Sequence, residues 1–302
     1  MQRFHPIGIP GQPWTDEDKA QWYSEQQPRR SYRDEVLAKL EQFDSPLEVE
    51  QYGALDIDPA RYPLFTVTCR ATLPDRPWAL ITGGVHGYET SGVQGALAVL
   101  KTKAMAYRER VNLLVAPCVS PWSYEVIHRW NPKAVDPNRS FLANSPSLEA
   151  ATVMAQVAKQ GVEFLVHMDL HETTDSDESE FRPALAARNG EAYEPGLIPD
   201  GFYTVGDTES PQPEFQAAII DAVRQVTHIA PPDDQGEIIG CKVTQPGVIN
   251  YPVGELGLCA GMTGARFVST TEVYPDSPKV TDEDCNAAQV AAVCAALDHA
   301  LA

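Results

Sequence analysis

Three apolar runs between residues 79 and 170 constrain the fold more than any other feature. They cover residues 79–82, 111–116 and 163–170, and helical patterns at 91–107 and 148–159 separate them. Continuous apolar runs of this length are typical of strands buried on both faces. Strands that alternate with helices predict an α/β fold: a mixed, mostly parallel, twisted sheet with helices on both faces.

The whole chain, residues 1–302, is expected to form a single domain. Residues 1–30, which are rich in proline, glutamine and charge, are interpreted as an N-terminal arm packed on the body. The formal net charge of -19 argues against nucleic acid and anionic membranes as partners. No apolar run approaches 18 residues, so no membrane span is expected. The oligomeric state stays open.

The cysteines and the N-terminus bear on the compartment. The six cysteines are scattered and form no CxxC pair, which favours buried free thiols over a disulfide framework. The first residues carry no apolar segment typical of a signal peptide. A cytoplasmic location is the expectation.

A glycine-rich turn directly after the run at 79–82 carries the first candidate site. His86 and Glu89 stand on this turn, and Gly83, Gly84 and Gly87 permit the tight bend that would aim both side chains at one point. An imidazole and a carboxylate are two of the three protein ligands of a catalytic zinc site with two His and one carboxylate. A strand-to-helix turn with surface side chains would show the same pattern, so the motif needs a third ligand elsewhere.

His171 and Glu272 are the candidates for a third ligand and a general base. His171 follows the run at 163–170, so it should lie at the same sheet edge as His86. In α/β sheets, ligand-binding and active sites are commonly found at the carboxyl ends of the strands. Glu272 lies inside a strand-like segment at 267–273, where a carboxylate is costly to bury unless it is paired or functional. A position on the polar face of an edge strand is the alternative.

Two arginines in the loop at 117–144 could grip a substrate. Arg129 and Arg139 can each bind a carboxylate in bidentate fashion. Surface ion pairs are the ordinary role of such loop arginines. The acidic run at 175–180, directly after His171, is expected to be a solvated loop, although it could also line a cleft.

Four short motifs in order resemble the zinc carboxypeptidase superfamily, which includes carboxypeptidase A relatives and the succinylglutamate desuccinylase/aspartoacylase branch. They are His-Gly-Tyr-Glu at 86–89, Asp-Pro-Asn-Arg-Ser-Phe at 136–141, Asp-Leu-His at 169–171 and Thr-Glu at 271–272. The resemblance covers roughly residues 60–275. Pro137 and Ser140 depart from the usual Asp-Leu-Asn-Arg-Asn-Phe, while the asparagine and arginine remain.

The resemblance implies one zinc ion bound by His86, Glu89 and His171. Asp136 then corresponds to the carboxylate that orients the first histidine ligand, a partner that fixes ring direction and tautomer. The fold implied is the mixed α/β sheet of the zinc carboxypeptidases.

The resemblance also implies the residues that bind and cleave the substrate. Asn138 and Arg139 correspond to the pair that holds the substrate's free carboxylate, and Arg129 to the arginine that polarises the scissile carbonyl. Glu272 corresponds to the general base. Tyr251 stands at a suitable distance before it to be the mobile tyrosine of the family, but its surroundings do not fix that alignment.

Three functions share these residues. A metallocarboxypeptidase acting on a peptide or peptide-like substrate is favoured. The alternatives are an N-acyl amino acid deacylase and an inactive metal- or peptide-binding protein. In each case the partner is a small molecule or peptide with a free carboxylate.

Overall fold

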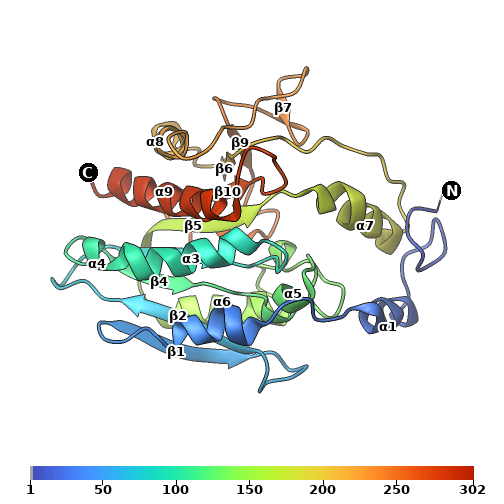
Figure 1. Cartoon of the computed structure of the whole chain (residues 1–302), viewed down its shortest axis with the longest axis horizontal. Helices are drawn as coiled ribbons and strands as arrows, with labels where there is room; N and C mark the ends of the chain where they lie inside the picture. Colours follow the sequence, from blue (N-terminus) through green and yellow to red (C-terminus); the bar gives the residue numbers. More distant parts are fainter. Residues whose placement is uncertain (1–2) are drawn as a thin grey trace.

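The computed structural model describes residues 3–302, which fold around one eight-stranded sheet (Figure 1). Its strand order is β1-β2-β4-β3-β5-β10-β6-β9. In chain order these strands are β1 (Leu47–Ala54), β2 (Pro63–Cys69), β3 (Trp78–Gly83), β4 (Asn112–Ala116), β5 (Phe164–Glu172), β6 (Tyr203–Asp207), β9 (Val248–Tyr251) and β10 (Phe267–Val273). A small hairpin of β7 (Glu237–Ile238) and β8 (Cys241–Lys242) lies outside the sheet.

The centre of the sheet is parallel and its flanks are mixed. β4, β3, β5 and β10 are parallel neighbours, whereas β1, β2 and β6 join by antiparallel pairs and β9 runs parallel to β6. The predicted α/β fold with a mixed, mostly parallel sheet is therefore confirmed. The parallel centre matters for function, because it brings the carboxyl ends of β3, β5 and β10 to one edge.

Helices cover both faces of this sheet. The α-helices are α1 (Asp16–Glu25), α2 (Ala38–Leu40), α3 (Thr90–Thr102), α4 (Ala104–Tyr107), α5 (Pro121–Val126), α6 (Leu148–Lys159), α7 (Arg182–Asn189), α8 (Pro213–Val223) and α9 (Asp282–Ala300). Two π-helical turns span Arg33–Leu37 and Asp177–Phe181, and 3-10 turns span Pro137–Arg139 and Cys259–Gly261. None of the helices described in residues 3–302 is long and apolar enough to cross a membrane.

The strand residues alternate between two apolar clusters, one on each side of the sheet. Ile81 of β3 belongs to the cluster that includes residues of α3 and α9, whereas its neighbour Leu80 packs with Val153 of α6. Side chains of adjacent strand residues point to opposite faces. Burial on both faces is the reason why the central strands are continuous apolar runs.

Three segments differ from the sequence-based expectation. The long loop expected at 117–144 contains α5, whose six residues are all buried, so tertiary packing stabilises a helix too short to predict. The acidic run at 175–180 is not an irregular loop: a π-helical turn begins at Asp177, and α7 follows it directly. At 31–43 the apolar spacing of Val36, Leu37, Leu40 and Phe43 predicts one helix, whereas the structure has a π-helical turn followed by the short α2.

The arm at residues 3–30 packs on the body through tryptophans. Helix α1 begins with a capping box between Thr15 and Asp18, and its Trp22 is only 2% exposed. The Trp22 ring lies 6.1 Å from Trp122 and 5.7 Å from Trp130, measured between centroids. These contacts hold α1 against the loop that follows β4, beside the candidate site.

We expect Trp22→Ala to lower the free energy of unfolding by about 3–5 kcal/mol, because a large buried aromatic side chain leaves a cavity. Chemical denaturation of both proteins measures the difference. Leu197→Ala is the control: Leu197 is 73% exposed, so its loss should cost under about 0.5 kcal/mol. Equal effects of the two substitutions would contradict the packing of the arm.

Candidate metal centre

The turn between β3 and α3 places His86 and Glu89 at the carboxyl edge of the sheet. Gly84 adopts a φ of 61°, which L-residues rarely occupy. At Gly87 a Cβ would lie 2.0 Å from the backbone of Ser123, so only glycine fits there. The turn is therefore pressed against α5, and both side chains are directed inward, with exposed fractions of 2% and 1%.

Arg30, at the end of the arm, fastens this turn from outside. Its guanidinium donates hydrogen bonds of 2.6 Å to the carbonyl of Gly87, the carbonyl of Tyr124 and the hydroxyl of Thr90. The same group lies 3.5 Å from the centroid of the Tyr124 ring. Sequence reasoning missed Arg30, because only the folded arm brings it to the turn.

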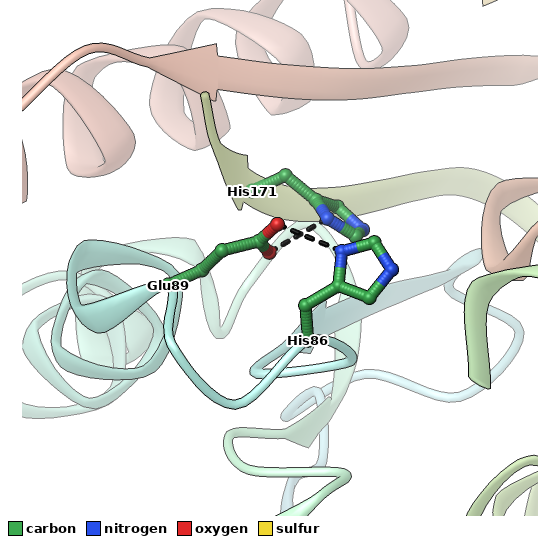
Figure 2. Close-up of side chains that lie close together, drawn as sticks. All are labelled: His86, Glu89 and His171. Atoms are coloured by element: carbon green, nitrogen blue, oxygen red, sulfur yellow. Dashed lines mark hydrogen bonds and ion pairs between the residues drawn. The ribbon is translucent and has the colours of Figure 1, made fainter. Parts of the chain in front are cut away.

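His171 reaches the same point from the end of β5 (Figure 2). The carboxylate of Glu89 lies between the two imidazoles: Oε1 is 2.8 Å from Nδ1 of His86, and Oε2 is 2.7 Å from Nδ1 of His171. One ligand atom from each residue falls within 4.8 Å of the others. These three residues form the only such metal-binding group of His, Cys, Asp and Glu found within residues 3–302.

The outer nitrogens of both imidazoles face aspartates. Nε2 of His86 lies 2.9 Å from Asp136, and Nε2 of His171 lies 2.7 Å from Asp169. A carboxylate accepts hydrogen bonds, so each Nε2 is placed to donate to its aspartate, and Nδ1 of each ring is the nitrogen that faces Glu89 and could bind a cation. Asp169, the first residue of the Asp-Leu-His motif, is thus positioned to orient His171.

Three electron-pair donors that face one another in a buried site need a positive charge between them. Oε2 of Glu89 makes no well-directed hydrogen bond within the described chain, although Nδ1 of His171 is 2.7 Å away. Despite burial, Asp169 and Glu89 raise the pKa of His171 well above its usual value, which shows that this group of carboxylates favours a positive charge at the site. The donor set therefore fits a divalent cation with nitrogen and oxygen ligands.

Glu272 lies beside His171 in the sheet. In the parallel pairing of β10 with β5, Glu272 is opposite His171, and in the antiparallel pairing with β6 it is opposite Tyr203. Thr173 donates a hydrogen bond of 2.8 Å to Oε2 of Glu272. Glu272 is thus on a central strand that faces the candidate metal group, which excludes the edge-strand alternative.

Burial raises the pKa of Glu272 to about 8, and the nearby charge of Glu89 adds to the shift. A carboxyl group with this pKa can hold a proton near neutral pH, as a general acid–base group must. A cation among the neighbouring ligands would lower the pKa again, because it favours the charged carboxylate.

Arg129 occupies the wall of the site next to Asp136. Its Nε donates to Asp136 at 3.1 Å, and its Nη1 lies 3.2 Å from the Tyr88 hydroxyl and 3.4 Å from Asp177. Burial would raise the pKa of Asp136, but Arg129 and His86 together lower it well below the usual range. Nη2 of Arg129 makes no hydrogen bond within residues 3–302 and is available for a ligand.

Asn138 and Arg139 lie on the 3-10 turn at Pro137–Arg139, which Asp136 caps by accepting from the Asn138 amide. The side-chain oxygen of Asn138 accepts a hydrogen bond of 2.8 Å from the backbone of Cys259. Arg139 is exposed and donates only to its neighbour's carbonyl, at 2.7 Å. No carboxylate of the described residues forms an ion pair with Arg139.

All nine residues singled out from the sequence line one cleft of about 790 Å³. They are His86, Glu89, Arg129, Asp136, Asn138, Arg139, His171, Tyr251 and Glu272. Tyr251 ends β9 and is half-buried. Pro13, Trp14 and Lys19 of the arm also line the cleft, so residues outside the four motifs help to shape it.

Sequence reasoning missed two further groups of this cleft. Asp177 belongs to the acidic run expected to be solvated, but it is buried and accepts hydrogen bonds from Tyr88 and the backbone of Thr174. Tyr203 shares a hydrogen bond of 2.7 Å with Thr173, next to Glu272. The register of β6 against β10 places Tyr203, and no local sequence signal reveals that register.

Solved structures share this architecture over nearly the whole chain. A protein from Shewanella amazonensis, provisionally named a metallopeptidase, matches with a TM-score of 0.66 at 22% identity, over 90% of this chain and 92% of that one. A similarly named protein from Shewanella denitrificans gives 0.65 at 22% identity, over 89% of each chain. A metallo-carboxypeptidase from Burkholderia cenocepacia gives 0.60 at 15% identity, over 95% of this chain and 69% of that one. The chain has the zinc carboxypeptidase fold.

The resemblance drawn from the four motifs is thus confirmed for the fold. No family model and no curated protein matches the sequence. A shared fold at 15–22% sequence identity does not establish a shared activity. The function therefore depends on the side chains of the cleft.

Proposed function

We propose that this chain is a zinc-dependent metallocarboxypeptidase, which hydrolyses the amide bond next to a free carboxylate of a peptide or peptide-like substrate. The observation that carries the proposal is the pairing of Glu272 with His171 across β10 and β5, beside the group of His86, Glu89 and His171. A buried carboxyl group next to a candidate metal site supports proton transfer to and from a hydrolytic water.

His86, Glu89 and His171 would hold the ion, and Asp136 and Asp169 would fix the direction of the two imidazoles. A zinc ion bound there supplies Lewis acidity and lowers the pKa of water. Glu272 takes a proton from the attacking water and passes it to the leaving amine. Thr173, hydrogen-bonded to Oε2 of Glu272, keeps this carboxylate in place.

The arginines bind the two oxygen-bearing groups of the substrate. Arg129, held by Asp136 and Asp177, directs its free Nη2 at the scissile carbonyl. The amide nitrogen of Asn138 and the guanidinium of Arg139 hold the terminal carboxylate, and Tyr251 closes over the bound substrate. Because Arg139 has no carboxylate partner in the described chain, a substrate carboxylate need not displace one.

Turnover of acetylated short peptides, measured as release of the C-terminal amino acid, tests the proposal. We expect hydrolysis of peptides with a free C-terminus and none of their C-terminal amides. A series of N-acyl amino acids in the same assay tests the deacylase alternative. Hydrolysis of N-acyl amino acids without hydrolysis of peptides would replace the carboxypeptidase assignment, and turnover of neither would reject both.

Arg139→Gln should raise KM for peptides with a free C-terminus by about 10- to 100-fold, because a charge-assisted hydrogen bond to the substrate is lost. Steady-state kinetics measure the change. Arg110→Gln is the matched control, since Arg110 pairs with Asp298 at the surface and does not line the cleft. An unchanged KM in Arg139→Gln would remove Arg139 from carboxylate binding.

A further inference from the structure

The cleft gathers positive side chains although the protein as a whole carries a net charge of -19. Its basic lining residues are Lys19, Arg129, Lys133, Arg139, Arg182 and Arg188. Four of them are paired with acidic residues of the chain. Lys19 pairs with Asp16, Arg129 with Asp136 and Asp177, Lys133 with Asp56, and Arg182 with Glu178.

Arg139 and Arg188 are the two basic lining residues that have no such partner within residues 3–302. Arg139 is assigned to the first substrate carboxylate under the proposed function. Arg188 belongs to none of the four motifs. Its guanidinium is half-buried and forms no ion pair with the described chain, so it is available to an anionic ligand.

Arg188 is held in a fixed position near the C-terminal end of α7. Its Nη1 donates a hydrogen bond of 2.6 Å to the carbonyl of Ala134, and its Nε donates to Asn189 at 3.2 Å. Its guanidinium carbon lies 4.6 Å from the centroid of the Trp130 ring. Nη2 makes no hydrogen bond within the described chain. The group is therefore ordered in advance, which reduces the entropy lost when it binds an anion.

The N-terminal arm builds this position. The backbone amide of Trp14 donates a hydrogen bond of 2.8 Å to the carbonyl of Arg188, and the Trp14 ring lies 6.0 Å from Trp130. Trp14 also lines the cleft. Arm, α7 and the loop after α5 thus converge on one wall, where Arg188 is the unpaired cation.

We infer that Arg188 forms a second anion-binding position, so that the preferred substrate is a short peptide with an acidic side chain in addition to its terminal carboxylate. A planar guanidinium with free N–H groups suits a carboxylate. This inference deepens the proposed function and rests on it for the role of Arg139. It concerns which peptide is bound, not how the bond is cleaved.

Binding to a zinc-loaded Glu272→Gln protein tests the inference without turnover. Isothermal titration calorimetry is run with four acetylated dipeptides, Glu-Ala and Ala-Glu together with their glutamine counterparts. We expect at least one glutamate peptide to bind about 10- to 100-fold more tightly than its isosteric glutamine counterpart. Adding Arg188→Gln should abolish this ratio and leave the affinity for the glutamine peptides unchanged, which also shows that the cleft is intact.

Lys133→Gln, in the same Glu272→Gln protein, is the matched control. This substitution removes the same positive charge from the cleft, but Lys133 already pairs with the exposed Asp56. It should keep the ratio. Equal affinities for glutamate and glutamine peptides, or a ratio that survives Arg188→Gln, would overturn the inference. Failure of the proposed function looks different: the protein with Glu272 intact would hydrolyse no peptide, while the binding ratio could still be measured.

Discussion

Glu272→Gln should lower kcat for peptide hydrolysis by about 10²- to 10⁴-fold, the usual contribution of a positioned general acid–base group. Glutamine keeps the size of the side chain and can still accept from Thr173, but it cannot take a proton from water. Because Glu272 is not among the three ligand residues, zinc content should stay at the level of the unmutated protein. Steady-state kinetics and metal analysis of the same preparation measure both quantities.

The control for this substitution is Glu214→Gln, at the exposed first turn of α8, which should leave kcat unchanged. Rates within a few-fold of the unmutated protein in Glu272→Gln would exclude Glu272 as the base. A simultaneous loss of zinc and rate would show that Glu272 supports the metal site instead.

His171→Ala should weaken zinc binding by more than about 100-fold, because even residues that only orient a metal ligand are typically worth 10- to 100-fold in affinity. The substitution removes one of the three ligand atoms and leaves the fully buried Asp169 with the hydrogen bond from Thr82 but without its histidine partner. Zinc per protein after dialysis against a weak chelator is the readout, followed by competition titration for affinity.

His228→Ala is the matched control for His171→Ala. His228 also pairs with an aspartate, since its Nε2 lies 2.7 Å from Asp200, but it does not line the cleft. Its loss should not change the zinc content. If His171→Ala retained zinc with unchanged affinity while folded, the three-residue metal site would be wrong.

Local sequence patterns were sufficient to predict the sheet and its carboxyl edge. The continuous apolar runs indicate strands that are buried on both faces. The glycines at the end of β3 indicate a tight turn, and at Gly87 no larger residue would fit. For this reason the sequence predicts that His86, Glu89 and His171 share one edge of the sheet, whereas the role of Glu272 is implied only by the resemblance of the four motifs. Helix α5 and the turn at 177–181 escaped prediction, because their burial comes from contacts with distant segments.

The sequence by itself determined which chemical groups stand at the ends of β3 and β5 and within β10, since apolar runs mark buried strands and glycines mark the turn after β3. The order and register of these strands, which bring the groups together, are set by pairing between distant segments. Only the tertiary structure decided how these groups are held and what surrounds them. Arg30 on the ligand turn, Tyr203 beside Glu272 and Arg188 in the cleft wall are all placed by long-range contacts. Such contacts depend on packing between segments far apart in the chain, and no residue spacing encodes them.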